Sequence, residues 1–241
     1  MNDLKKILVT GGTGNLGSAV VNALTSKGFD VIAGGTDPVK EKTPPGVKAV
    51  KVVYEEPDSI DKALKGVSGL FLIAPPMDPE APSKLIPVID KAKAAGVDHI
   101  VFNSALGVDH NEEAPLRIIE QYLKASGVNY TILRPNFFME NFSTGFIAPM
   151  IDGGGIFLAA DDGKTSFIST KDIAEVAALA FQHKRFGVEY NLTGPDALDH
   201  AEAAKIISAN SGKNVTYHAL TEEEMLQGAR DKGMPEEAVS L

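Results

Sequence analysis

Short apolar runs alternate with amphipathic segments in a regular rhythm over the first 135 residues. The apolar runs are four to seven residues long, which is typical of strands. They lie at 5–9, 30–33, 47–53, 70–73, 99–102 and 130–133. Helical patterns begin at 18 and recur at 59–65, 85–95 and 116–125. Because strands that alternate with helices form parallel sheets, we predict an α/β fold with a doubly wound parallel sheet.

A glycine-rich turn joins the first predicted strand to the first predicted helix. It reads Gly-x-Gly-x-x-Gly from Gly12, or Gly-x-x-Gly-x-x-Gly from Gly11. Glycines allow a tight turn and a close backbone approach to a pyrophosphate, which the amides of a helix N-terminus can then bind. The turn therefore predicts a dinucleotide-binding domain of the Rossmann type. The expected contacts are Gly11, Thr13, Gly14, Asn15, Leu16 and Gly17.

The alternation of strand and helix patterns ends after Pro135, and residues 136–165 are rich in Phe, Met, Asn and Gly. Helical patterns return at 171–182 and 201–211, with short strands at 190–192 and 215–218. We predict a dinucleotide-binding domain of residues 1–135 plus about 165–183. Residues of about 136–164 and 184–241 are predicted to form a small C-terminal α/β subdomain that binds the substrate.

Ligands of open parallel sheets bind beyond the carboxyl ends of the strands. Further cofactor contacts are therefore expected in the segments that follow the predicted strands. We expect them at Thr36, Asp37, Lys40, Ala74, Pro75, Asn103, Pro135, Asn136 and Phe137.

The composition excludes several classes of partner. A net charge of -9 argues against nucleic acid, which requires a basic face. No apolar run approaches the ~20 residues of a membrane span, and the N-terminal apolar run is too short for a signal peptide. We therefore expect a cytoplasmic protein, as a monomer or a homodimer. Without cysteine, and with five scattered histidines, we expect no metal site and a core role for His99.

Five segments, in chain order, resemble the NmrA-like branch of the atypical short-chain dehydrogenase/reductase superfamily. They are residues 9–17, 95–105, 126–141, 167–174 and 190–195. The family includes NAD(P)H:quinone oxidoreductases, triphenylmethane-dye reductases and non-catalytic nicotinamide sensors that regulate transcription factors. The resemblance implies a nicotinamide dinucleotide as the ligand, but it does not choose among these functions.

Most short-chain dehydrogenases use a Tyr-x-x-x-Lys pair as the base, and none of the five tyrosines here has a lysine four positions on. Hydride transfer to a quinone-like or aromatic acceptor does not need that base, whereas a nucleotide-sugar epimerase does. We therefore expect an NAD(P)H-dependent oxidoreductase, with a nicotinamide sensor acting on a protein partner as the alternative. By resemblance, Ser104 matches the catalytic serine of the superfamily.

The residues expected to distinguish NADP from NAD do not decide between the two cofactors. The family usually carries Arg-Asn-Pro-x-x-Lys after the second strand, and this chain reads Thr36-Asp37-Pro38-Val39-Lys40. Asp37 stands where an NAD enzyme has its ribose-binding acid, while Lys40 could approach a 2′-phosphate. The resemblance favours NADP, with NAD as the alternative.

An aromatic segment after Arg134-Pro135 is predicted to contact the acceptor, because rings and methionine suit a flat apolar molecule. Its members are Phe138, Met139, Asn141, Phe142 and Phe146. Such a stripe is also typical of plain core packing. On the preceding helix, Arg117 is expected on the solvated face, and Glu120 is expected to pair with Lys124 one turn later.

Overall fold

The computed structural model describes residues 6–37 and 43–231, and the chain forms two compact units. The larger unit takes Met1–Pro135 and Thr170–Leu192, and the smaller one takes Asn136–Ser169 and Thr193–Leu241. These boundaries differ from the predicted ones at two places. Residues 184–192 belong to the larger unit, because 188–192 pairs with its sheet. Residues 165–169 belong to the smaller one, where Thr165 bridges Leu198 and Ile168 bridges Phe138.

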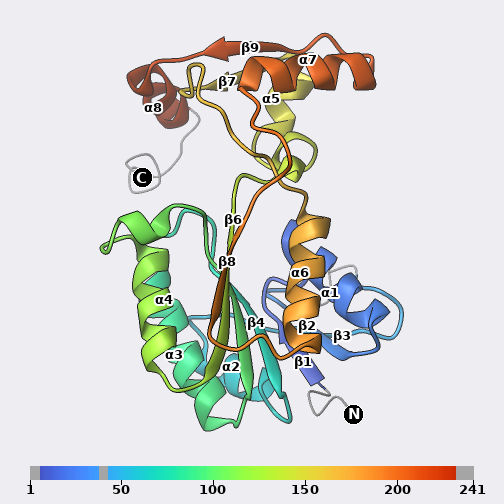
Figure 1. Ribbon diagram of the computed structural model, residues 1–241, viewed down its shortest axis with the longest axis vertical. Helices are drawn as coiled ribbons and strands as arrows, with labels where there is room; N and C mark the ends of the chain where they lie inside the picture. Colours follow the sequence, from blue (N-terminus) through green and yellow to red (C-terminus); the bar gives the residue numbers. More distant parts are fainter. Residues whose placement is uncertain (1–5, 38–42, 232–241) are drawn as a thin grey trace. The chain divides into compact units, whose positions relative to one another are not determined.

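The larger unit is built on a seven-stranded sheet with the order β3-β2-β1-β4-β5-β6-β8, and every pairing in it is parallel (Figure 1). The predicted fold class, a doubly wound parallel sheet of the Rossmann type, is therefore confirmed. The strands are β1 Lys6–Val9, β2 Asp30–Gly35, β3 Lys48–Lys51, β4 Gly69–Ile73, β5 His99–Asn103, β6 Asn129–Pro135 and β8 Val188–Leu192.

Helices cover both faces of this sheet (Figure 1). On one face, α2 Pro57–Ala63, α3 Ala81–Ala94 and α4 Pro115–Ala125 bury their apolar stripes against alternate residues of the strands. On the other lie α1 Asn15–Ser26 and α6 Thr170–Gln182. A short 3₁₀ turn, η1 Val108–His110, follows β5.

His99 has the core role that its position predicted. It is fully buried in β5, in edge-to-face contact with the rings of Phe181 and Phe186. Thr131 donates its hydroxyl hydrogen to the carbonyl of Arg185, so its oxygen accepts from His99 Nε2 at 2.9 Å. His99 therefore carries its proton on Nε2, and burial lowers its pKa to about 4.

The smaller unit contains a two-stranded parallel sheet of β7 and β9. Its core is formed by Ile147, Ile151, Ile156, Ala204 and Val215. The sequence pattern did not predict two of its elements, the helix α5 and the strand β7, within residues 136–165. Its elements are η2 Met139–Phe142, α5 Ala148–Asp152, β7 Gly155–Leu158, α7 His200–Ser211, β9 Thr216–Ala219 and α8 Glu222–Asp231.

Within the described ranges, no helix combines the length and the apolar composition that crossing a membrane requires.

Candidate functional site

The glycine-rich turn is a closely packed loop between β1 and α1. Gly11 has a φ of +58°, a left-handed conformation that favours glycine. The amide of Gly12 donates to the carbonyl of Gly34 on β2 at 2.8 Å, and the amide of Gly14 donates to Gly11 at 2.9 Å. Backbone bonds therefore fix the turn against the neighbouring strand, before any ligand contributes.

The start of α1 is available to an anion because the turn leaves its first amides unused. The first backbone bond into the helix runs from Ser18 N–H to Gly14 O, so the amides of Asn15, Leu16 and Gly17 have no intrahelical acceptor. A Cβ at position 17 would lie 1.9 Å from the carbonyl oxygen of Gly11. Only glycine therefore allows this approach of turn and helix, which is the shape that a pyrophosphate requires.

The residues expected to distinguish NADP from NAD follow the end of β2. Gly34 packs closely, since a Cβ there would lie 2.6 Å from a methyl group of Val52. Thr36 is exposed and Asp37 is half-buried just beyond the strand. Lys40 lies outside the described residues.

Two side chains, those of Thr10 and Tyr54, fix the end of β4. The Thr10 hydroxyl donates to Phe71 O at 3.3 Å and accepts from the amide of Ile73 at 2.9 Å. The Tyr54 hydroxyl donates to Ile73 O at 2.6 Å, and burial raises the pKa of this phenol to about 12. The predicted contacts Ala74 and Pro75, both half-buried, follow directly from this anchored strand end.

The end of β5 holds two buried polar atoms with no hydrogen-bond partner in the described part of the chain. They are Oδ1 of Asn103 and Oγ of Ser104, although the Ser104 hydroxyl lies near enough to Glu120 to lower the pKa of that carboxyl. The Ser104 amide donates to Leu133 O on β6 at 2.8 Å, and its side chain is only 3% exposed. Pro135 is buried at the end of β6, and its carbonyl accepts from the amide of Leu106 at 2.9 Å. The unpaired atoms are places where a ligand could supply the missing bonds.

Arg134 is the centre of a buried charge network beside this edge. Its guanidinium donates to both carboxylate oxygens of Glu120, at 2.9 and 2.7 Å, and also contacts Asp109 and Glu189. Glu120 is fully buried, and burial alone would raise its pKa. Arg134, first, and then Ser104 and Arg117 together outweigh burial and hold this pKa below its ordinary value, so the pair is charged.

The expectations for helix α4 were wrong. Glu120 turns inward to Arg134 rather than pairing with Lys124, which instead bridges to Glu189. Arg117 also contacts Glu120, at 3.2 Å, instead of lying free on the solvated face. The i,i+4 spacing gave the wrong partner because β6 and β8 bring charges to this helix from distant parts of the sequence.

In the smaller unit, the aromatic segment forms a cluster of rings around His200. Phe137, Phe142 and Phe167 lie with ring centroids 5.1–6.2 Å apart, and each lies 5.6–6.4 Å from the imidazole. Phe138 and Asn141 are half-buried, as is Asn136, whose side-chain oxygen accepts from the amide of Phe137. For Phe137 and Phe142, the structure therefore shows a packing role.

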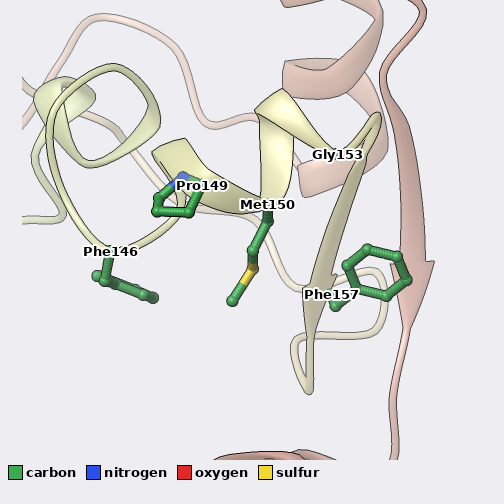
Figure 2. A pocket seen from close by; sticks show the side chains of 5 residues that line it. All are labelled: Phe146, Pro149, Met150, Gly153 and Phe157. Atoms are coloured by element: carbon green, nitrogen blue, oxygen red, sulfur yellow. The ribbon is translucent and has the colours of Figure 1, made fainter. Parts of the chain in front are cut away.

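Two residues of the predicted acceptor set are exposed, Met139 and Phe146. Phe146 lines an open apolar hollow of about 460 Å³ with Pro149, Met150, Gly153 and Phe157. Figure 2 shows the side chain of Met150 projecting from α5 between the two phenylalanine side chains. In the part of the chain that the structure describes, no three His, Asp or Glu side chains gather as a metal site would require.

Sequence reasoning missed Tyr54 and the partners of Arg134. Tyr54 was considered only as a possible catalytic base, and nothing in the sequence links it to Ile73. The acids around Arg134 come from η1, α4 and β8, so their gathering leaves no local motif.

Comparison with known proteins shows which family the chain resembles over most of its length. The NmrA-like family matches residues 3–239. The chain is 36% identical over 236 residues to prestalk A differentiation protein A of Dictyostelium discoideum, covering 95% of this chain and 77% of that protein. It is 33% identical over 239 residues to an NAD(P)H azoreductase of Xenophilus azovorans, covering 95% and 82% respectively.

Among solved structures, the NADPH-dependent quinone oxidoreductase of Escherichia coli in complex with NADPH matches with a TM-score of 0.80 and 28% identity. That match covers 97% of this chain and 85% of the other. The resemblance predicted from the five sequence segments is therefore confirmed: this chain belongs to the NmrA-like family.

Proposed function

We propose that this protein is an NAD(P)H-dependent oxidoreductase that passes hydride to a quinone-like or other aromatic acceptor. The observation that carries the proposal is the anion cradle at the start of α1, where the absence of a Cβ at Gly17 brings the turn and the free amides together. The relatives support the chemistry, since two of them are named as an azoreductase and a quinone oxidoreductase.

NADP(H) is the proposed cofactor, with NAD(H) as the alternative. The turn residues from Gly11 to Gly17 would bind the pyrophosphate, and the segments after β2 and β4 would hold the adenosine half. The NADPH complex of the Escherichia coli relative supports NADP(H). Thr36 offers no positive charge to a 2′-phosphate, so the preference is expected to be modest.

The reduced nicotinamide supplies the hydride to the acceptor, and the remaining proton comes from solvent or a hydroxyl group. Tyr54 is unsuited to act as a base at this edge, because its phenol has a pKa of about 12 and already donates its hydrogen to Ile73. We propose that Ser104 lies beside the reacting groups, where its buried hydroxyl, next to the Glu120 carboxylate, can form a hydrogen bond with a ligand. The acceptor contacts of Phe138, Met139, Asn141, Phe142 and Phe146 stay predictions.

The test is oxidation of NADPH or NADH at saturating 2-methyl-1,4-naphthoquinone, followed by absorbance of the reduced nicotinamide. A rate above the protein-free rate supports the enzyme, and the G17A variant should have a lower rate than wild type at subsaturating NADPH. Nucleotide binding without turnover across a panel of quinones and azo dyes would overturn the proposal.

The alternative is a nicotinamide sensor that acts through a protein partner. The observation in its favour is the 36% identity to a relative that is named for differentiation rather than for a reaction. A sensor would bind NADP(H) or NAD(H) without turnover. It would then bind its partner differently in the presence of each nucleotide.

A further inference from the structure

The loop that follows β4 holds a methionine in an unusual conformation. Met77 has a φ of +48°, in the left-handed region that residues with a Cβ rarely adopt. Its side chain is also 64% exposed. Glycine would suit this backbone better, so the sequence keeps a large apolar side chain at a position where both backbone and solvent disfavour it.

The surrounding loop enforces this conformation. Pro75 and Pro76 precede Met77 and restrict the backbone on that side. Asp78 follows it and accepts from the amide of Glu80 at 2.9 Å and from Lys84 Nζ at 2.6 Å. Strain that is held in place by its neighbours is typical of functional positions.

Met77 lies in a loop at the carboxyl edge of the sheet. Because β4 and β5 are paired in parallel, with Ile73 opposite Asn103, the loops after them leave the sheet at the same edge. The second loop carries Leu106, which is 37% exposed and follows Ser104 by two residues. This edge is where ligands of doubly wound sheets bind, so each of the two loops carries an exposed apolar side chain at the expected ligand-binding edge.

We propose that Met77 is a specificity-determining residue whose side chain contacts the ring of the aromatic acceptor. The inference rests on the proposed oxidoreductase function and places an acceptor contact on the larger unit. An unbranched thioether packs against rings of different shape, which suits an acceptor more than a cofactor of fixed structure. Leu106, on the neighbouring loop, offers a second apolar contact.

The test compares M77G, M77A and M77L with wild type, using 2-methyl-1,4-naphthoquinone as the acceptor. M77G relieves the backbone strain and M77A keeps it, while both remove the side chain. Both should raise the KM for the quinone roughly tenfold, because an apolar contact is lost. Their Kd for NADPH should stay within about twofold of wild type, and M77L should retain most of the affinity for the quinone.

The matched control is K184G, since Lys184 also has a positive φ, of +49°, but lies between α6 and β8 at the amino edge of the sheet. It should leave the KM for the quinone unchanged. Unfolding temperatures of all variants should stay within a few degrees of wild type, which excludes loss of fold as the cause. A KM that changes equally in K184G, a wild-type KM in M77G and M77A, or a loss of NADPH affinity in those variants would overturn the inference.

Quinone binding in the presence of NADP⁺, measured by calorimetry, separates this inference from the proposed function because it requires no turnover. Wild-type protein that binds the quinone through Met77 but never oxidises NADPH would refute the oxidoreductase and support the binding contact. If wild-type protein oxidises NADPH and the M77G and M77A variants bind the quinone as tightly as wild type, only the contact is refuted.

Discussion

Replacing Arg134 by methionine should strongly destabilise the larger unit. The substitution removes the cation but keeps most of the apolar stem, so the effect reports on charge rather than on volume. Glu120 is fully buried, and among the described residues the positive charge that it keeps without Arg134 is Arg117, at 3.2 Å. A buried carboxylate that loses its main partner retains the cost of desolvation without the attraction that offset it.

The magnitude follows from the two bonds that are lost. Arg134 donates to both oxygens of Glu120, at 2.9 and 2.7 Å, and each charge-assisted bond contributes about 1.5 kcal/mol or more. R134M should therefore lower the free energy of unfolding by about 3 kcal/mol, a large part of the total of a typical domain. With a urea dependence of about 2 kcal/mol/M, the midpoint should fall by roughly 1.5 M.

The assay is urea denaturation followed by far-ultraviolet circular dichroism, with R117M as the matched control. Arg117 contacts the same carboxylate, but it also lies nearer the solvent and pairs with the exposed Glu112, so R117M should shift the midpoint much less. The double variant E120L/R134M, which removes both charges, should be more stable than R134M alone. Equal midpoints for R134M and R117M would refute the reasoning.

Three further predictions concern the cofactor site and the core. G17A places a Cβ within 1.9 Å of Gly11 O, so the turn must open and the Kd for NADPH should rise about tenfold or more. A Kd for NADPH that calorimetry finds within twofold of wild type would contradict this prediction. T36R places a guanidinium beside the expected 2′-phosphate and should improve the ratio of NADPH to NADH affinity about tenfold, whereas an unchanged ratio would argue against this position. His99 has a pKa of about 4 when folded and 6.5 as its ordinary value, so unfolding takes up a proton between these values. Its contribution to stability should therefore rise by about 3 kcal/mol from pH 4 to 6.5, and H99Q should flatten this part of the urea-midpoint profile; an unchanged slope would exclude His99 as its source.

The sequence predicted the larger unit well because its signals are local. Each strand except β8 has a short apolar run, each helix has its own periodicity, and the glycines of the turn at Gly11–Gly17 indicate its conformation. The prediction was weaker for residues 136–165, where α5 and β7 are only five and four residues long. Such short elements are stabilised by packing against α7 and β9 rather than by a pattern of their own.

The candidate site divides in the same way. The conformation of the glycine turn and the common edge of the strand ends were predictable, because parallel strands bring their carboxyl ends to one edge. The inward turn of Glu120 was not, and the spacing to Lys124 predicted the wrong ion pair. The difference lies in distance along the chain: Glu189, which replaces Glu120 as the partner of Lys124, is far from it in sequence.

By itself the sequence determined the parallel sheet, the glycine turn and the family, since each depends on residues that are neighbours in the chain. Only the tertiary structure decided which charges are buried, which tyrosine anchors β4 and which methionine stands exposed and strained at the carboxyl edge. These properties depend on what surrounds a side chain after folding. In the folded chain, the burial of each side chain and its neighbours, rather than its residue type, determine the pKa of Tyr54, the ion pairs of Arg134 and the exposure of Met77.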